Sequence, residues 1–263
     1  MLESSDDRKG IQSIEVGGQL LRALSRHAGP MLLRDIAREA GMAPAKAHPY
    51  LVSFCKIRLT EQDPGTGRYQ LGALALRLGL AGLTQSVVFS RAEVALSDLK
   101  QRVQHTVAFA VWGQLGPTIV RMSEVDFPLE INLRVGSVMS MVSTATGRVF
   151  ATYMPRTSTD RLIELELRRM ASTVSDRARL KTRYMKELAE TRERGMGRAL
   201  SDPIPDVNAL AAPVFDEDRS LELVVLVVGS AENFDASWSG SIAQSLAAFC
   251  SATSGSTSKL AGL

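Results

Sequence analysis

Two short apolar stripes separated by one glycine constrain the fold of this chain more than any other feature of its sequence. Each stripe follows the i, i+3, i+4, i+7 spacing of one face of a helix. Gly41 lies between the stripes and can adopt the positive φ that ends a helix. Two short helices joined by such a turn form a helix-turn-helix. The first stripe comprises Leu33, Ile36, Ala37 and Ala40, and the second comprises Ala47, Tyr50, Leu51 and Phe54.

The flanking segments extend this motif. Residues 11–27 have the apolar spacing of a helix, with Ser13 as a candidate N-cap. Residues 59–71 indicate a short hairpin around a turn rich in proline and glycine at 63–67. A hairpin directly after a helix-turn-helix is a wing. The first part of the chain is therefore predicted to be a winged helix-turn-helix.

Two helical segments follow the wing. Residues 72–83 are strongly apolar and permit a helix despite three glycines, and a second helix is predicted from about Arg91 to Gln104. We expect these helices to connect two domains, because 263 residues exceed the usual size of one compact domain. Part of their apolar surface is expected to contact a partner subunit.

The period of the pattern changes after Thr106, where short β-branched segments alternate with turns and helices. An antiparallel sheet with helices on one side is expected, which is an α+β, sensor-like domain. The predicted strands are residues 106–112, 118–124, 130–136, 208–215 and 221–229, and the predicted helices are residues 143–154, 157–170, 176–194 and 237–250.

Composition excludes several classes of protein. No apolar run approaches the ~18 to 20 residues that span a bilayer, and the polar first ten residues lack the pattern of a secretory signal, so a cytoplasmic protein without membrane association is expected. Cys55 and Cys250 form no CxxC pair, and the three histidines have no metal-ligand spacing, so neither a metal site nor a cofactor is expected. The formal net charge of +3 lies wholly in the first 83 residues, which suits a module that contacts phosphate.

Several separated strings resemble the IclR family of bacterial transcriptional regulators, over nearly the whole chain from Ile11 to about Ser251. They are SIEVG at 13–17, DIAREAGM at 35–42, EQDPGTGRYQLG at 61–72, RVGS at 134–137, ATGRVFATYMP at 145–155 and AAPVFD at 211–216. The resemblance implies a winged helix-turn-helix, a linker helix and a GAF-like effector domain that binds a small, often carboxylated metabolite. It also implies a homodimer or dimer of dimers on partly palindromic double-stranded operator DNA.

The resemblance and the pattern together give one domain plan. Residues 1–10 are expected to be flexible, and residues 253–263 to form a flexible tail. The winged helix-turn-helix covers 11–73, the linker helices and dimerisation segment cover 74–104, and the effector-binding domain covers 105–252.

Polar residues on the second short helix are candidates for DNA contact. Lys46 and His48 are the candidates for direct contact with bases, and Ser53 also faces the groove. The alternative is that each is a solvated surface group. Pro49 removes one backbone hydrogen bond, so either the helix begins near residues 45–47 or it bends. The candidates for phosphate contact are Arg34, Lys56, Arg58 and Arg68.

The segment 144–147 is the candidate effector site, because the N-terminus of a helix presents unpaired N–H groups that can hold a carboxylate. The alternative is an ordinary N-cap followed by a packing glycine. Asp202 and Asp206 lie in a loop that could cover a ligand. The scarcity of polar residues in the late strands favours an effector with an apolar or aromatic body. The full set of candidates is Phe109, Trp112, Met139, Met141, Thr144, Ala145, Thr146, Asp202, Leu226 and Val228.

Two other functions compete with an effector-controlled regulator. One is an enzyme on a GAF-like domain with Cys250 as nucleophile, but this cysteine lies among apolar helix residues with no histidine later in the chain, so no catalytic residue is expected. The other is an effector-independent DNA-binding oligomer, which a cavity filled by side chains would favour. In the regulator, effector binding is expected to shift the population of linker-helix arrangements. Release of DNA and recruitment of RNA polymerase both remain open outcomes.

Overall fold

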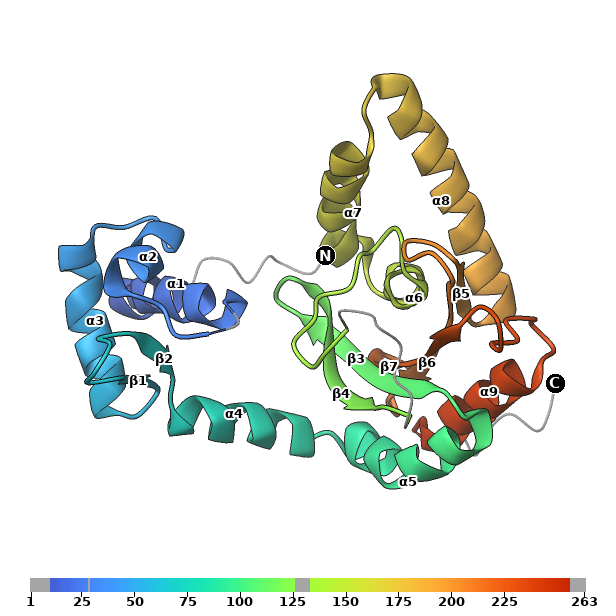
Figure 1. Ribbon diagram of the computed structural model, residues 1–263, viewed down its shortest axis with the longest axis horizontal. Helices are drawn as coiled ribbons and strands as arrows, with labels where there is room; N and C mark the ends of the chain where they lie inside the picture. The colour runs from blue at the N-terminus through green and yellow to red at the C-terminus, as the bar shows by residue number, and fades with distance from the viewer. Residues whose placement is uncertain (1–9, 28, 126–132, 256–263) are drawn as a thin grey trace. The chain divides into compact units, whose positions relative to one another are not determined.

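The structure, a computed structural model, describes residues 10–27, 29–125 and 133–255 (Figure 1). The chain divides into two compact units, Met1–Gln85 and Ser86–Leu263. Of the two predicted linker helices, the first belongs to the first unit and the second to the second unit.

The first unit is a winged helix-turn-helix, as predicted. Gly41 has a φ of +67°, and the N–H of Met42 donates to the carbonyl of Ala37 at 2.9 Å, which closes the turn between the two short helices. Ala37 is fully buried, so the helices approach closely there. The elements are α1 (Gln12–Arg26), α2 (Leu33–Glu39), α3 (Pro44–Lys56), β1 (Thr60–Gln62), β2 (Tyr69–Leu71) and α4 (Ala73–Thr84).

Two helix starts differ from the sequence expectation. The N-cap of α1 is Ile11, so Ser13 lies inside the helix and does not cap it. Helix α3 begins at Pro44, where a proline suits the first helical position, and Pro49 lies beyond the first turn. The helix is assigned without a break from Pro44 to Lys56.

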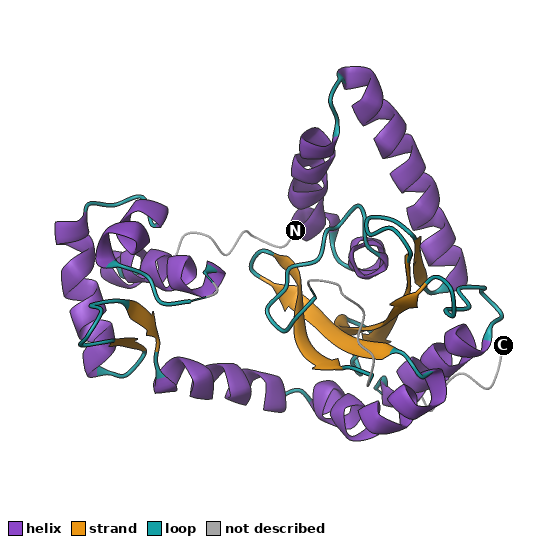
Figure 2. Cartoon of the chain, in the orientation of Figure 1, coloured by secondary structure: helices purple, strands orange, loops and turns teal. Residues whose placement is uncertain are grey.

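The second unit is an α+β domain with one five-stranded antiparallel sheet, of order β4-β3-β7-β6-β5 (Figure 2). Its strands are β3 (Thr106–Gly113), β4 (Gly116–Ser123), β5 (Gly197–Leu200), β6 (Val207–Phe215) and β7 (Leu221–Ser230). Its helices are α5 (Val87–Val103), α6 (Ala145–Tyr153), α7 (Arg156–Met170), α8 (Val174–Arg194) and α9 (Ser241–Thr253).

Helices cover both faces of this sheet, so the expectation of helices on one side was wrong. On one face, side chains such as Val225 and Val227 join a cluster with residues of α5 and α9. On the opposite face, Leu226 and Val228 join a cluster with residues of α6. Helices α7 and α8 meet at a short connection and straddle α6 (Figure 1). A strand buried on both faces has a nearly continuous apolar sequence, as β7 has.

Three further segments differ from the predicted elements. Strand β5 was not predicted. Of the strand predicted at 130–136, residues 130–132 lie outside the described residues, and residues 133–136 form a loop and turn instead. The predicted flexible ends fall almost wholly outside the described residues, but Thr253 still belongs to α9, and the N–H of Gly255 donates to the carbonyl of Phe215 at 2.9 Å.

No single helix among the described residues is long and apolar enough to cross a membrane. Helices α4 and α5 pass that test only as a broken pair, by length and composition.

Candidate DNA-binding and effector sites

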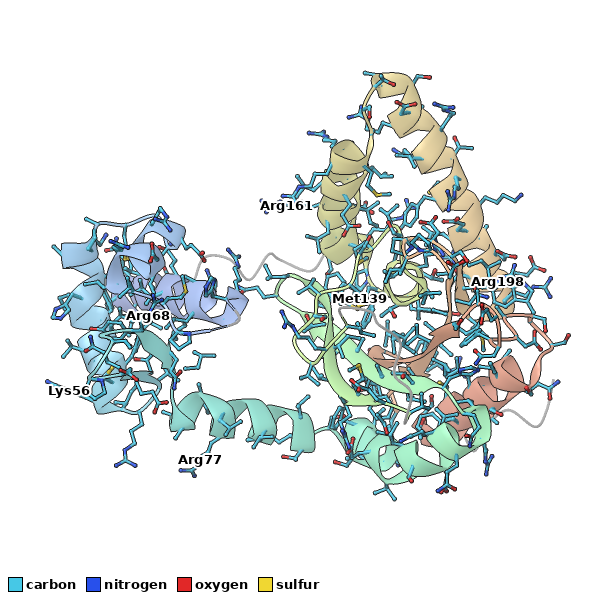
Figure 3. The ribbon with its side chains drawn as sticks, in the orientation of Figure 1. Lys56, Arg68, Arg77, Met139, Arg161 and Arg198 are labelled. Carbon is cyan, nitrogen blue, oxygen red and sulfur yellow. The ribbon has the colours of Figure 1, made fainter. Side chains whose placement is uncertain are left out.

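All seven candidate DNA-contacting side chains are exposed in the first unit. They are Arg34, Lys46, His48, Ser53, Lys56, Arg58 and Arg68. Three already have partners within the unit: the Ser53 hydroxyl donates to the Pro49 carbonyl at 2.9 Å, and Arg68 donates to the Pro30 carbonyl at 3.2 Å. Arg34 forms a long ion pair with Asp35 at 3.8 Å. Lys56, at the C-terminal end of α3, extends away from the core of the unit (Figure 3).

Sequence reasoning missed the outermost row of α3. Ala47 and Leu51 are fully buried and mark the inner face of the helix. The positions opposite them are Ala45, Pro49 and Val52, which are all exposed. The spacing i, i+4, i+7 places these three side chains in one line along the helix. The position of this row follows from the buried pair on a helical wheel. Its side chains are uncharged, however, so the charge pattern of the sequence does not indicate it.

The wing turn is fixed by Asp63. Its carboxylate accepts hydrogen bonds from the N–H groups of Gly65 at 2.8 Å and Thr66 at 2.7 Å, and the Thr66 amide is the main cause of a lowered pKa for Asp63. Gly67 has a φ of +68°, which favours glycine at this position. The turn therefore holds the exposed Arg68 directly before the start of β2.

In the second unit, a small cavity of about 70 Å³ lies between the sheet and the N-terminus of α6. Leu226 and Val228 of β7 line the cavity on the side of the sheet, and Leu133 lines it from the segment before α6. Met139 comes from the same segment (Figure 3). Asp202, Pro203 and Ile204, from the loop between β5 and β6, also line it. The remaining lining residues are Thr144, Ala145, Thr146, Ala199, Val207 and Ala209.

The first turn of α6 supplies the polar groups of this cavity. The Thr144 hydroxyl accepts from the Gly147 N–H at 3.0 Å and donates to the Ser140 carbonyl at 2.6 Å, so Thr144 is the N-cap. The amides of Ala145 and Thr146 have no hydrogen-bond partner among the described residues. The buried hydroxyl of Thr146 has no partner there either. Three polar groups of one helical turn thus remain unpaired beside the cavity.

Gly147 is also a packing glycine, which is what the alternative interpretation of residues 144–147 predicted. A Cβ at this position would lie 2.0 Å from the Ser140 carbonyl oxygen and 2.6 Å from the Met141 Cα. The preceding loop is anchored by Glu166 of α7, whose carboxylate accepts from the Ser140 hydroxyl at 2.6 Å and from the Met141 N–H at 3.0 Å. Sequence reasoning did not single out Glu166.

Three of the ten candidate effector residues do not line this cavity. Phe109 lies on the opposite face of the sheet, in the cluster with α5 and α9, because successive side chains of a strand point to opposite faces. Trp112 points to the α6 face but packs against Phe150, with ring centroids 5.7 Å apart. Met141 is buried in the core beneath α6. Asp206 is likewise absent from the lining.

Six lining residues were missed. Ala209 pairs with Val228 across β6 and β7, so its position beside the cavity follows from strand register, which the sequence alone does not give. Ala199 belongs to β5, which was not predicted. The others are Leu133, Pro203, Ile204 and Val207.

Comparison with known proteins decides what these two units are. The family model described as the IclR helix-turn-helix domain matches residues 13–64. The one described as "Bacterial transcriptional regulator IclR C-terminal" matches residues 81–255. The chain belongs to the IclR family.

Sequence similarity to individual relatives extends over most of this IclR-family chain. The glycerol operon regulatory protein of Streptomyces coelicolor is 31% identical over 85% of this chain and 87% of its own. The crystal structure of Pseudomonas aeruginosa HmgR is 34% identical, covers 93% of this chain and 97% of its own, and has a TM-score of 0.57.

A further crystal structure shares the fold. It is an IclR homolog from Microbacterium hydrocarbonoxydans complexed with 4-hydroxybenzoate. It is 18% identical, covers 91% of this chain and 96% of its own, and has a TM-score of 0.70. The two family models identify the protein as a DNA-binding transcriptional regulator with an effector-binding C-terminal domain, and the family is not one of enzymes.

A chain of ion pairs connects the cavity of this IclR-family protein to α6. Asp202, which lines the cavity, pairs with Arg183 of α8. Arg183 donates to Glu187 at 2.9 Å, and Glu187 pairs with Arg148 of α6 at 3.0 Å. Arg148 also donates to the carbonyl of Arg198. Only 3% of the Arg148 side chain is exposed, and this burial lowers its pKa, an effect that Glu187 opposes.

This arrangement predicts that replacing Glu187 and replacing Arg148 lower the free energy of unfolding by different amounts. Glu187→Leu leaves the Arg148 charge buried without its carboxylate and should lower the free energy of unfolding by about 3–5 kcal/mol. Arg148→Met removes the buried charge itself and should cost about 1 kcal/mol, mainly the bond to the Arg198 carbonyl. Arg183→Ala, which removes an exposed guanidinium and leaves the Arg148–Glu187 pair in place, should cost at most about 0.5 kcal/mol.

Urea unfolding followed by tryptophan fluorescence measures this difference. Both tryptophans of the chain, Trp112 and Trp238, lie in the second unit, so the signal reports that unit alone. Equal losses in Glu187→Leu and Arg148→Met would show that the desolvated charge of Arg148 does not dominate.

Cys250 has none of the surroundings of a nucleophile. It is 4% exposed and donates a weak hydrogen bond to the Ala212 carbonyl at 3.8 Å. Burial raises the pKa of the Cys250 thiol, so the thiol stays protonated at neutral pH. This agrees with a family of regulators rather than enzymes.

Proposed function

We propose that the second unit binds a small carboxylic acid whose carboxylate sits on the first turn of α6, and that its occupancy controls operator binding by a homodimer. The observation that carries this proposal is the set of unpaired polar groups beside an apolar cavity: the amides of Ala145 and Thr146 and the buried hydroxyl of Thr146. Helix N-termini favour anions because free N–H groups and the helix dipole act together.

The cavity walls support an apolar body behind the carboxylate. Leu226, Val228 and Val207 offer a ligand neither donors nor acceptors from their side chains. The cavity of about 70 Å³ is several times the roughly 10–15 Å³ that one water molecule needs in a cavity. A short aliphatic acid fits this volume. An aromatic acid, such as the 4-hydroxybenzoate held by the Microbacterium homolog, requires the loop that carries Pro203 and Ile204 to move outward.

The first unit is proposed to contact DNA through α3 and the wing. Lys46 and His48 face the major groove, and the exposed cations around them contact phosphate without selecting a sequence. The cations proposed to contact phosphate are Arg34, Lys56, Arg58 and Arg68.

A protein that acts on the chromosome works in the cytoplasm, and we propose that location for this one.

A second copy of the chain is proposed to cover α4. This helix buries no residue of its own, and its exposed leucines include Leu76 and Leu80. Effector binding then acts by favouring one arrangement of the linker helices in the dimer, which changes the separation of the two α3 helices. A ligand shifts such an equilibrium only by its difference in affinity for the two arrangements.

Fluorescence anisotropy tests the effector proposal. The purified protein is titrated onto DNA from upstream of its own gene, with and without propionate, benzoate or 4-hydroxybenzoate. Benzyl alcohol and glycerol serve as uncharged controls. We expect at least one acid to change the dissociation constant by about fivefold or more, the scale of a 1 kcal/mol coupling, and the alcohols to have no effect.

A cavity-filling variant links that response to this site. Ala209→Phe places a ring in the cavity and should abolish the response to the acid while DNA affinity remains. Ala248→Phe, at an exposed position of α9, is the matched control and should respond normally. An unchanged response in Ala209→Phe would move the effector elsewhere. Specific DNA binding that no acid alters would favour the effector-independent oligomer.

A further inference from the structure

We propose that the exposed row Ala45, Pro49 and Val52 of α3 recognises thymine through its C5-methyl group. The inference rests on the proposed contact of α3 with the major groove and adds which chemical group the centre of the helix selects. All three side chains are exposed, with 36% of Val52 accessible, and they lie opposite the fully buried Ala47 and Leu51. They therefore form the part of α3 that enters a groove most deeply.

This row offers a base edge no side-chain hydrogen bond. Ala45, Pro49 and Val52 carry neither donors nor acceptors on their side chains, and Pro49 also lacks a backbone N–H. Ser53 lies at the edge of the row, but its hydroxyl proton is already donated to the Pro49 carbonyl. Because that proton is engaged, Ser53 does not act as a donor to a base, and its hydroxyl oxygen remains an acceptor only.

The polar groups of α3 stand at the ends and on the flank of the row. Lys46 lies in the first turn and Lys56 is the last residue of the helix, while His48 lies beside the row. In the major groove, the C5-methyl of thymine is the apolar group that distinguishes one base from the others. An apolar centre between two cations thus matches thymine flanked by phosphates.

The charge of α3 favours DNA over a protein partner for this row. Between Pro44 and Lys56 the helix contains two lysines and one histidine but no aspartate or glutamate. A purely apolar docking face would gain nothing from this excess of positive charge, whereas a polyanion is attracted to it.

Replacing thymine by deoxyuridine tests the inference, because it removes the methyl group and keeps every base-edge donor and acceptor. The full-length protein first enriches a preferred site from a random duplex library. The dissociation constant is then measured for that site and for the same duplex built with deoxyuridine. We expect binding to weaken about fourfold for each contacted methyl group, as for the exposure of one buried methyl-sized group.

Variants of the row separate methyl contact from general effects of deoxyuridine on DNA shape. Val52→Ala and Pro49→Ala are exposed substitutions to a good helix former, so both should fold. In each, the affinity ratio between thymine and deoxyuridine duplexes should fall towards one. Val174→Ala, which alters an equally apolar and more exposed residue at the start of α8, should keep the wild-type ratio.

The outcomes are distinct. Equal affinity of the wild-type protein for both duplexes overturns the inference, as does a ratio that Val52→Ala and Pro49→Ala leave unchanged. Specific binding to the thymine duplex that Lys46→Ala and Lys56→Ala do not weaken would instead show that α3 does not contact DNA, which overturns the proposed contact itself. Failure to enrich any site does the same.

Discussion

Replacing Leu76 and Leu80 of α4 together by aspartate should convert the proposed dimer to a monomer and weaken operator binding by about a hundredfold or more. These side chains are 65% and 53% exposed, and they lie one turn apart on the same face. Burial of one leucine contributes about 1.5–3 kcal/mol, and a buried aspartate without a partner costs more than it replaces. The DNA effect follows because two linked DNA-binding units bind about 10²–10⁴ times more tightly than one.

Sedimentation equilibrium and anisotropy measure the two effects separately. The helix itself should survive, since none of its residues is buried within the chain and Arg77 is its one charged residue (Figure 3). Val174→Asp is the control, because it places one aspartate at an exposed apolar position where the start of α8 tolerates it. A variant that stays dimeric would place the interface outside α4. Loss of DNA affinity in a persistent dimer would mean that α4 contacts DNA.

Gly147→Ala should destabilise the second unit by about 3 kcal/mol and abolish any response to effector. The added Cβ would meet the Ser140 carbonyl oxygen at 2.0 Å, and backbone cannot rotate away as a flexible side chain can. Either α6 or the loop anchored by Glu166 must shift, and both border the cavity. Overpacking of this kind typically costs 1–3 kcal/mol and occasionally more.

Urea unfolding followed by tryptophan fluorescence provides the measurement, since both tryptophans report the second unit. Gly18→Ala is the control in α1, where an added Cβ meets no atom within 4 Å. Its greater helix propensity should stabilise the first unit by about 0.5–1 kcal/mol, seen by circular dichroism, and leave the fluorescence transition unchanged. Wild-type stability of Gly147→Ala would show that the α6 loop yields easily.

The helix-turn-helix was predictable because its information is local. The spacing of Ile36, Ala37, Ala47 and Leu51 specifies two buried faces, and Gly41 specifies the turn between them. The same reasoning did not identify the outer row of α3, although its positions follow from the inner face. Charge is a natural guide to DNA contact, but it says nothing of the uncharged positions that are proposed to lie closest to the bases.

The candidate effector site was only partly predictable because its walls come from distant segments. The string around Thr144 located the start of α6, and Asp202, Leu226 and Val228 also line the cavity. Phe109 and Trp112 cannot both line one wall of the cavity. Successive side chains of a strand point to opposite faces of the sheet, so residues three apart lie on opposite faces. The roles of Pro203 and Ile204 depend on how a loop folds over the sheet, which no local pattern encodes.

The continuous apolar sequence of β7 indicates two features of the second unit. It indicated few polar contacts for a ligand, which agrees with the lining of the cavity. It also indicated a strand buried on both faces, and therefore helices on both sides of the sheet.

Each hydrophobic cluster of the described residues draws its members from one unit alone. A substitution in the core that supports α3 therefore alters a different hydrophobic cluster from the one that borders the cavity. Such a chain can acquire a new operator or a new metabolite by separate mutational steps. Duplicated copies of its gene could accordingly diverge in one specificity while they retain the other, and recombination near Gln85 could exchange whole specificities between paralogues.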